Sequence, residues 1–415
     1  MRVQRIAAIA VVGAGFGAVL VPPVVAGASP TLLIVGSSPG CTGTFSTISS
    51  AVAAAVPGDT IKVCKGVYNE TVNVNTANLT FDGALAGTPG SAARKSASAN
   101  ESVVTSVNGD FILGSGANNT TITGFTLKGA GSPTVNHDGV EAFSGSSGLD
   151  LTDNVIQLNG NGVNFQNPNA ADPATIAFNY IWNNNSEGNP GTNGSTGTGV
   201  FISNGPANST SISNNTFGKD SQTAINFAGD SNNPSTGLVV ANNISTNDAT
   251  FLVAINSVNA LVEKNTITVS GAVPGGNGTG ILDFGANTAL HIAKNTMSSI
   301  ASVSSAIALA TFAGSASVGT SITSNSISGW SNGVHVDSGY TTAFVSKNKV
   351  SGNATTGVLV DTGTSGNVMS LNRVSGDASS IDCSDQSTGS LTAGTANTWL
   401  GNVGSDSNST PTGIC

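Results

Sequence analysis

Residues 333–374 read GVHVDSGYTTAFVSKNKVSGNATTGVLVDTGTSGNVMSLNRV, and this stretch contains two short motifs, each of which occurs twice. The first is a small residue followed by alternating apolar positions, at residues 333–336 and 357–360. The second is an apolar residue, two variable residues, Asn, one variable residue and another apolar residue, at residues 345–350 and 369–374. Each motif returns after 24 residues, since 357 minus 333 and 369 minus 345 are both 24. Alternation with a period of two indicates strands, so the stretch predicts short strands that return every 24 residues.

The same motifs recur along most of the chain. Small-residue motifs also begin at Gly139, Gly162 and Gly199. The Asn motif fits nine segments, and its Asn residues follow one another at intervals of 23 to 36 positions: Asn154, Asn179, Asn215, Asn242, Asn265, Asn295, Asn325, Asn348 and Asn372. This period fits a coil with two or three short strands per turn. Each strand stacks parallel on its counterpart in the next turn, about 4.8 Å away. The sequence therefore predicts one elongated all-β domain, a parallel β-helix (solenoid).

The recurrent Asn has a predicted structural role. We expect it to sit in a tight turn, where Asn tolerates left-handed backbone angles, and to form a ladder of side-chain hydrogen bonds between turns. Lys264, Lys294 and Lys347 each come directly before such an Asn and predict a loose column of solvated turn lysines.

Residues 45–68, which run from Phe-Ser-Thr-Ile to Gly-Val-Tyr, resemble the N-terminal segment of the pectate-lyase-like superfamily. In that superfamily a short helix caps the open end of a right-handed parallel β-helix, a Pro-Gly-Asp-Thr turn follows, and the first strand ends in Gly-x-Tyr. The residues agree, because Ile48, Val52 and Ala55 share one helical face and residues 57–58, Pro-Gly, stop the helix. The resemblance implies a right-handed coil with a short N-terminal capping helix. It implies no particular reaction, because the superfamily includes lyases, hydrolases, esterases, epimerases and non-catalytic adhesins.

The N-terminus predicts export. Arg2 and Arg5 precede an uncharged apolar run at residues 6–25, and Ala-Gly-Ala at residues 26–28 offers a cleavage site. An uncleaved anchor is the alternative, although residues 22–23, Pro-Pro, interrupt the run. We therefore expect a secreted, extracellular protein with no membrane contact after signal cleavage. Its predicted segments are a signal peptide (1–28), an N-terminal cap with the first turns (29–100), the β-helix repeats (101–383) and a C-terminal cap (384–415).

The net charge narrows the classes of molecule that the protein is expected to bind. The formal net charge of -9 disfavours nucleic acid and anionic lipid as partners, because both need a basic surface. It leaves the oligomeric state open.

The four cysteines allow three disulfide pairings. In an exported chain their spacing favours Cys41 with Cys64 and Cys383 with Cys415, one disulfide at each end of the coil. A zinc site is the weaker alternative, because no close Cys or His pair has zinc spacing.

Two groups of residues are candidates for chemistry, and the first lies near the C-terminus. Asp337 and Asp361 follow their small-residue motifs at the same distance, so they should stand one strand spacing apart, with His335 on the same outward face. Asp382 is expected in the His335 column, two turns later, and Asp385 close by. Paired carboxylates suit a retaining glycosidase, and Asp337 with Asp361 equally suits Ca²⁺, the one cofactor that the residues suggest. A solvated acidic edge without function is the alternative.

The second group is Asp138 and Glu141, in the segment Asn-His-Asp-Gly-Val-Glu at residues 136–141. This segment resembles the Asn-x-Asp-Gly motif of polygalacturonases, which would make Asp138 the first catalytic aspartate. The next turn has Asn161-Gly162 where that family has paired aspartates, and neither Gly-His-Gly nor Arg-Ile-Lys follows. The Gln-Asp-Thr and Gly-Arg-Pro-Trp motifs of pectin methylesterases are also missing. A polar strand edge is the alternative interpretation.

One acidic residue conflicts with the pattern. Asp283 falls on an inward position. Because an unpaired buried charge is costly, we expect the strand to slip so that Leu282 and Phe284 face inward; a buried carboxylate is the alternative.

The outward column of the small-residue strands is expected to be partly apolar. We expect the loop at residues 183–198 to cover it, and a docking surface is the alternative. The column consists of Phe201, Ala254, Leu282, Ala308 and Leu359, interspersed with Asn226 and His335.

These expectations favour a secreted β-helix protein that binds or contacts extracellular or cell-envelope polysaccharide through its many neutral hydrogen-bonding side chains. The alternative is a polysaccharide lyase or glycoside hydrolase. Its catalytic residues would be Asp337, Asp361 and His335, or Asp138 and Glu141.

Overall fold

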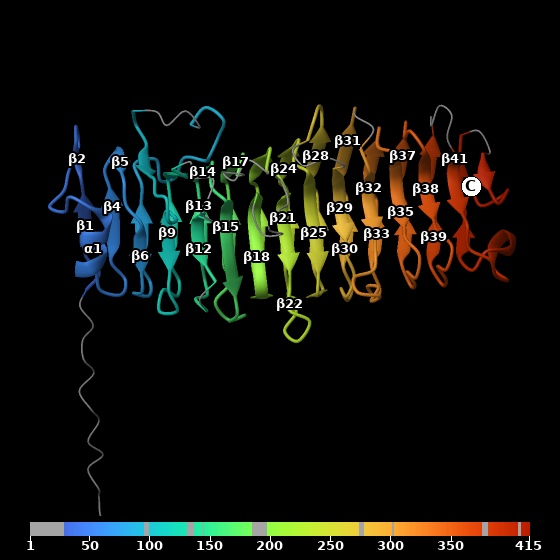
Figure 1. Cartoon of the computed structure of the whole chain (residues 1–415), viewed down its shortest axis with the longest axis horizontal. Helices are drawn as coiled ribbons and strands as arrows, with labels where there is room; N and C mark the ends of the chain where they lie inside the picture. The colour runs from blue at the N-terminus through green and yellow to red at the C-terminus, as the bar shows by residue number, and fades with distance from the viewer. Residues whose placement is uncertain are drawn as a thin grey trace, which may run out of the picture.

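The computed structural model describes residues 29–94, 99–130, 137–143, 145–184, 197–273, 278–300, 303–375, 381–405 and 408–415. The predicted signal peptide at residues 1–28 lies outside these ranges. The described chain is a right-handed parallel β-helix whose turns follow one another along the long axis, from the N-terminal end at β1 to the C-terminal end at β41 (Figure 1). The predicted all-β solenoid is confirmed.

Three long sheets run the length of the coil, and each turn contributes one strand to each of them. Every neighbouring pair within these sheets is parallel, as the repeat predicted. The first sheet contains fourteen strands: β1 (Leu32–Val35), β4 (Thr60–Val63), β7 (Thr80–Asp82), β10 (Thr121–Thr123), β13 (Asp150–Thr152), β16 (Ala174–Ala177), β19 (Thr210–Ser213), β23 (Val239–Ala241), β27 (Leu261–Glu263), β30 (His291–Ala293), β33 (Ser321–Thr323), β36 (Phe344–Ser346), β39 (Val368–Ser370) and β42 (Thr398–Leu400).

The second and third sheets follow the first in every turn. The second contains β5 (Gly66–Tyr68), β8 (Ser102–Val104), β11 (Phe125–Lys128), β14 (Val155–Gln157), β17 (Tyr180–Trp182), β20 (Thr216–Gly218), β24 (Ile244–Thr246), β28 (Thr266–Val269), β31 (Thr296–Ser299), β34 (Ser326–Ser328), β37 (Lys349–Ser351), β40 (Arg373–Ser375) and β43 (Val403–Gly404). The third contains β6 (Val72–Val74), β9 (Phe111–Leu113), β12 (Asp138–Ala142), β15 (Asn161–Asn167), β18 (Thr198–Ala207), β21 (Thr223–Ala228), β25 (Thr250–Ile255), β29 (Thr279–Asp283), β32 (Ser305–Leu309), β35 (Asn332–Val336), β38 (Thr356–Val360), β41 (Ile381–Asp385) and β44 (Ser409–Thr410).

Smaller elements lie outside these sheets. β2 (Ser37–Ser38) and β3 (Cys41–Thr42) form an antiparallel pair, and β22 (Ser235–Thr236) and β26 (Ser257–Val258) form a parallel pair. A 3₁₀ turn covers Thr392–Gly394 near the C-terminus. In the part of the chain that the structure describes, no helix is long and apolar enough to cross a membrane.

The alternating pattern places one apolar row inside the coil. In β35 the side chains of Val334 and Val336 are fully buried, while His335 between them points outward. Val334 pairs with Val358 of the next turn, so identical inward positions stack along the coil. Burial of these rows between neighbouring turns is the main favourable contribution to folding in such a repeat.

An Asn ladder closes the corner between the first and second sheets. The main-chain N–H and the side-chain amide of Asn295 both donate to Oδ1 of Asn325, at 2.9 and 3.0 Å, and the amide also donates to the carbonyl of Val262. The ladder runs through ten buried or half-buried residues: Asn154, Asn179, Asn215, Asn243, Asn265, Asn295, Asn325, Asn348, Asn372 and Asn402. The predicted ladder is therefore confirmed.

Two details of that prediction are wrong. The ladder residue in its fourth turn is Asn243 and not Asn242, because Val240 is the buried apolar position and Ile244 lies 49% exposed. The left-handed conformation belongs to the residue before each ladder Asn, as at Asn242 with φ 57° and Lys264 with φ 56°. The ladder Asn itself is selected for its amide and not for its tolerance of positive φ.

The N-terminal cap has the predicted helix, α1 (Ile48–Ala54). Ile48 and Ala51 are its buried residues, and the carboxylate of Glu70 accepts the first two helical N–H groups, from Ile48 at 2.8 Å and Ser49 at 2.9 Å. These bonds satisfy donors that a helix start leaves unpaired. The sequence missed β1, which precedes the helix. Gly-Val-Tyr also differs from the expectation, because it forms β5 in the second sheet and does not end the first strand.

Both predicted disulfides are present. Cys41 of β3 is bonded to Cys64, just after β4, and Cys383 of β41 is bonded to Cys415. Each joins the terminal turn at one end of the coil to an adjacent segment. They cross-link the two places where a solenoid lacks a neighbouring turn.

The expected slippage at Asp283 is wrong. Strand β29 stays in register with β25 and β32, and Asp283 is fully buried inside the coil. Its carboxylate accepts hydrogen bonds from Tyr340 Oη at 2.5 Å, Ser317 Oγ at 2.6 Å, Asn287 Nδ2 at 2.7 Å and Thr320 Oγ1 at 2.8 Å. These four side-chain donors and the main-chain N–H of Gly285, at 3.3 Å, replace the lost hydration, so the buried carboxyl group does not force a change of register.

Candidate functional site

The outward face of the third sheet carries both candidate groups. The register of this sheet places one side chain per turn in a single outward column: Glu141, Asn164, Phe201, Asn226, Val253, Leu282, Ala308, His335, Leu359 and Ser384. We call this surface the third-sheet face. The expected mixture of apolar and polar residues is present, with one correction: Val253 occupies the column, while Ala254 is buried inside the coil. The loop expected to cover the column falls mainly on residues 185–196, outside the described residues.

The C-terminal cluster consists of His335, Asp337 and Asp361. His335 belongs to β35, and the two aspartates directly follow β35 and β38. Nε2 of His335 lies 3.2 Å from Oδ1 of Asp337 and 3.2 Å from Oδ2 of Asp361. The side chains are 22%, 38% and 30% exposed, so all three remain accessible. The 24-residue repeat had predicted this proximity.

The electrostatics of this cluster act on the carboxyl group of Asp337. Partial burial raises the pKa of Asp337, the adjacent imidazole of His335 lowers it, and the nearby carboxylate of Asp361 raises it again. A carboxyl group that keeps its proton to higher pH, beside a second carboxylate, is the combination that acid-base chemistry on a glycosidic bond uses. One donor atom from each of the three residues lies within 4.8 Å of the others.

The three donor atoms of the C-terminal cluster can be compared with the ligands that Ca²⁺ prefers. The two carboxylates are suitable, but Ca²⁺ prefers six to eight oxygen ligands, and the third donor here is an imidazole nitrogen. An imidazole with two carboxylates suits Zn²⁺ or Mn²⁺ better. The residues therefore fit a divalent transition metal better than Ca²⁺.

Two further aspartates do not join the cluster. Ser384, and not Asp382, follows His335 and Leu359 in the outward column. Asp385 pairs with the inward residue of β38 and is buried, where Oδ2 accepts a hydrogen bond from Trp399 Nε1 at 2.8 Å. The expectation for both residues is wrong, because the closing turn of the coil shifts the count by one relative to the repeat.

The N-terminal cluster consists of Asp138 and Glu141 of β12 with Asn161 and Asn164 of β15. The amides of Asn161 and Asn164 donate to the two oxygens of Asp138, at 2.9 and 3.0 Å. Burial raises the pKa of Asp138, and these amide bonds oppose the increase. Burial also raises the pKa of Glu141, and the charge of Asp138 adds to it. A protonated, half-exposed Glu141 beside a fixed carboxylate can act as a proton donor.

Sequence reasoning had treated Asn161 as a departure from an enzyme motif and had not considered Asn164. Both lie one turn after β12, where Asn161 pairs with Asp138 and Asn164 pairs with Glu141. Each of these pairs is separated by 23 residues, so counting along the repeat could have found them. Asn136, which carried part of the polygalacturonase resemblance, lies outside the described residues.

The two clusters lie on one face but far apart. Glu141 and His335 occupy the same column and are separated by seven strand spacings. At about 4.8 Å per spacing this is about 34 Å, so they cannot act on the same bond. A long chain could contact both.

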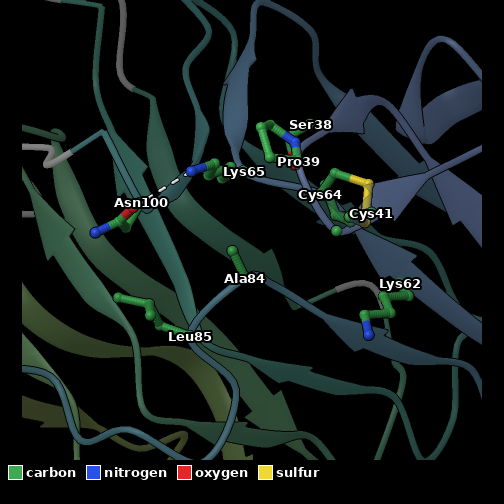
Figure 2. A pocket seen from close by; sticks show the side chains of 11 residues that line it. Ser38, Pro39, Cys41, Lys62, Cys64, Lys65, Ala84, Leu85 and Asn100 are labelled. Carbon is green, nitrogen blue, oxygen red and sulfur yellow. Dashed lines mark hydrogen bonds between the residues drawn. A yellow bond between two sulfur atoms is a disulfide. The ribbon is translucent and has the colours of Figure 1, made fainter.

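A cavity of about 350 Å³ lies elsewhere, at the N-terminal end of the coil. Figure 2 shows Lys65 directed toward Asn100, with the Cys41–Cys64 disulfide forming another part of the wall. No residue of either cluster lines this cavity. The chemistry suggested by the sequence therefore lies on an open sheet face and not in this cavity.

Comparison with solved structures supports the fold. The catalytic unit of a thermostable GH87 alpha-1,3-glucanase from Streptomyces thermodiastaticus strain HF3-3 has a TM-score of 0.61 and 15% sequence identity, over 87% of this chain and 66% of that chain. GH136 lacto-N-biosidase from Eubacterium ramulus has a TM-score of 0.50 and 12% identity, over 83% and 64%. This chain thus spans just under two-thirds of the length of either protein. No protein-family model and no curated protein matches the sequence. These likenesses show the fold, a right-handed parallel β-helix, as the N-terminal resemblance implied.

Proposed function

We propose that this protein is a secreted β-helix that binds polysaccharide along its third-sheet face. The observation that carries the proposal is the outward column of that face, which contains one side chain per turn from Glu141 to Ser384. Seven of these ten side chains are partly exposed, while Phe201, Ala308 and Ser384 are buried. A linear row that mixes polar and apolar groups suits a linear polymer, because sugars combine hydrogen-bonding hydroxyls with apolar ring faces. Two disulfides and the N-terminal sequence favour an extracellular location, and the net charge of -9 disfavours nucleic acid as partner.

The folds of two glycan-acting enzymes support a carbohydrate partner by analogy. The names of these proteins describe an alpha-1,3-glucanase and a lacto-N-biosidase. Because fold does not determine reaction, the analogy favours a class of ligand and not a linkage.

Glycoside hydrolysis at the C-terminal cluster is the second candidate, with Asp337 as proton donor and Asp361 as nucleophile. The specific observation in its favour is the close approach of their donor atoms, within 4.8 Å, together with the raised pKa of Asp337. Retaining glycosidases hold their two carboxyl groups about 5 to 5.5 Å apart. His335 between them would orient Asp361 and balance its charge. The N-terminal cluster, in which burial and the charge of Asp138 raise the pKa of Glu141, is the corresponding candidate for a hydrolase or lyase reaction.

The test is a combined binding and cleavage assay with purified mature protein. Retention on a panel of insoluble plant, algal and bacterial polysaccharides would be measured beside the release of reducing ends and unsaturated products, with Ca²⁺, Mn²⁺ or EDTA. Retention without cleavage supports the binding function, and cleavage supports the enzyme. Retention unchanged by Leu282→Asp, a substitution in the middle of the third-sheet face, would contradict the proposed binding surface.

A further inference from the structure

A line of positive charge follows one corner of the coil, on a surface separate from the third-sheet face. Five exposed cationic residues lie at the corner between the first and second sheets, and we call them the corner strip: Lys264, Lys294, Lys347, Lys349 and Arg373. The described chain has ten lysines and arginines in total, so half of them gather on this one edge.

The Asn ladder explains why the side chains line up. Lys264, Lys294 and Lys347 are the residues just before a ladder Asn, and they have φ values of 56°, 57° and 56°. All three side chains at this left-handed position are exposed. Lys349 and Arg373 begin β37 and β40 and are paired in register, so they continue the line on the far side of the ladder.

The spacing of the charges follows from the strand stacking. The strip covers five consecutive turns, from that of Lys264 to that of Arg373, with Ser324 as the neutral member of the series. Four strand spacings of about 4.8 Å give a line about 19 Å long. Four of the five turns therefore offer at least one cation, and the strand spacing is comparable to the length of one sugar residue in an extended chain.

The strip is largely unneutralised within the described residues. One ion pair involves it, between Lys264 and Glu263 at 3.0 Å, and its lysine is 51% exposed. The exposed pair in the C-terminal cluster, Asp337 and Asp361, belongs to the third sheet and lies on another face of the same turns. A protein of net charge -9 thus keeps a separate line of positive charge.

We propose that the corner strip binds an acidic polysaccharide that carries one carboxylate per sugar residue. A single row of lysines matches a single row of carboxylates, and the counterions that such a chain releases on binding would provide much of the affinity. Duplex DNA and anionic membranes present broader charge, which five cations in one row on an acidic protein match poorly. This surface adds to the proposed function and does not depend on the third-sheet face.

The test uses variants whose substitutions already occur at equivalent positions of other turns. Lys294→Asn and Lys347→Asn reproduce Asn242, which has the same left-handed conformation, and Lys349→Thr reproduces Thr296 of the same column. The triple variant removes three of the five charges without a demand on the backbone. Lys62→Gln combined with Lys65→Gln is the control, because it removes two charges beside the N-terminal cavity.

Binding to polygalacturonate, neutral dextran and duplex DNA would be measured by affinity electrophoresis at 50 and 200 mM NaCl. We expect wild-type binding to polygalacturonate that weakens about tenfold at the higher salt, and about tenfold weaker binding by the triple variant at low salt. The control should bind like the wild type. Ser324→Lys, which completes the row, should bind about threefold more tightly at low salt.

Equal affinity of wild type and triple variant for polygalacturonate would overturn the inference, as would equal retention by dextran or tighter binding of DNA. If neutral glycans are retained and the triple variant changes nothing, the inference fails while the proposed function stands. If no glycan is retained at all, both fail. Circular dichroism of each variant confirms that the coil is intact.

Discussion

A second ladder, at the corner between the second and third sheets, ends in two carboxyl groups and provides the most quantitative prediction. It runs through Asn159, Asn184, Asp220 and Asp248. The main-chain N–H of Asp220 donates to Oδ1 of Asp248 at 2.9 Å, and both aspartates are buried. In the Asn ladder each amide also donates to a carbonyl group, which an ionised carboxylate cannot do. Among the described residues, Oδ2 of Asp220 has no hydrogen-bond partner.

Burial raises the pKa of Asp248, and hydrogen bonds from Ser245 and Asp220 lower it. The net effect is an increase from 3.8 to about 7. Burial and the charge of Asp248 raise the pKa of Asp220 as well. Well below pH 3.8 both the folded and the unfolded state hold the Asp248 proton, and the raised pKa has no effect on stability. As the pH rises, the unfolded chain loses the proton first, and the free energy of unfolding falls by about 1.4 kcal/mol per pH unit. Over about three pH units this amounts to about 4 kcal/mol at pH 7.

Asp248→Asn should remove this loss. The amide oxygen can still accept from the Asp220 N–H, and the amide nitrogen can donate to the hydroxyl oxygen of Ser245. We expect the variant and the wild type to have the same thermal midpoint at pH 4, and the variant to melt several degrees higher at pH 7.

The measurement is the thermal midpoint by far-ultraviolet circular dichroism, at half-unit steps from pH 4 to pH 8. Asp230→Asn is the control, because it makes the same chemical change at a half-buried turn residue whose Oδ1 accepts one main-chain N–H. Midpoints of Asp248→Asn that run parallel to the wild type over the whole range would refute the reasoning, since they would mean that Asp248 is ionised in the folded protein at the same pH as in the unfolded chain.

Three other predictions concern the cluster, the ladder and the disulfides. Asp361→Asn should leave the circular dichroism spectrum intact and abolish any glycan cleavage, because it removes the nucleophile; unchanged turnover would exclude the C-terminal cluster. Asn295→Ala should destabilise the coil by about 2 to 4 kcal/mol in urea titrations, because it leaves buried partners such as the Asn265 N–H unsatisfied, whereas Thr296→Ala beside it should change little. Reduction of Cys41–Cys64 and Cys383–Cys415 should increase hydrogen exchange in the terminal turns only, and a global loss of β-sheet signal would contradict this.

The sequence by itself determined the coil, its capping helix, both disulfides and the proximity of Asp337 to Asp361. The repeat, the disulfide pairing in an exported chain and the proximity of the two aspartates follow from spacing, whereas the capping helix and the right-handed coil follow from the resemblance of residues 45–68 to a known superfamily. When a repeat has a constant period, equal offsets within the repeat become neighbours in space, so counting residues predicts contacts between turns.

Only the tertiary structure decided the register of the ladder where the repeat count is ambiguous. It also decided which carboxyl groups are buried, because other side chains supply their hydrogen bonds. The pattern favours Asn242, because apolar Ile244 completes its motif whereas Ser245 stands at that position for Asn243. Packing of Val240 inside the coil nevertheless selects Asn243. Asp283 stays inside the coil because four side-chain donors surround it, three of which come from later turns and are revealed by no local pattern. Asp385 turns inward for the same reason, toward Trp399. The stability of a buried charge depends on hydrogen-bond partners that only the folded chain brings together.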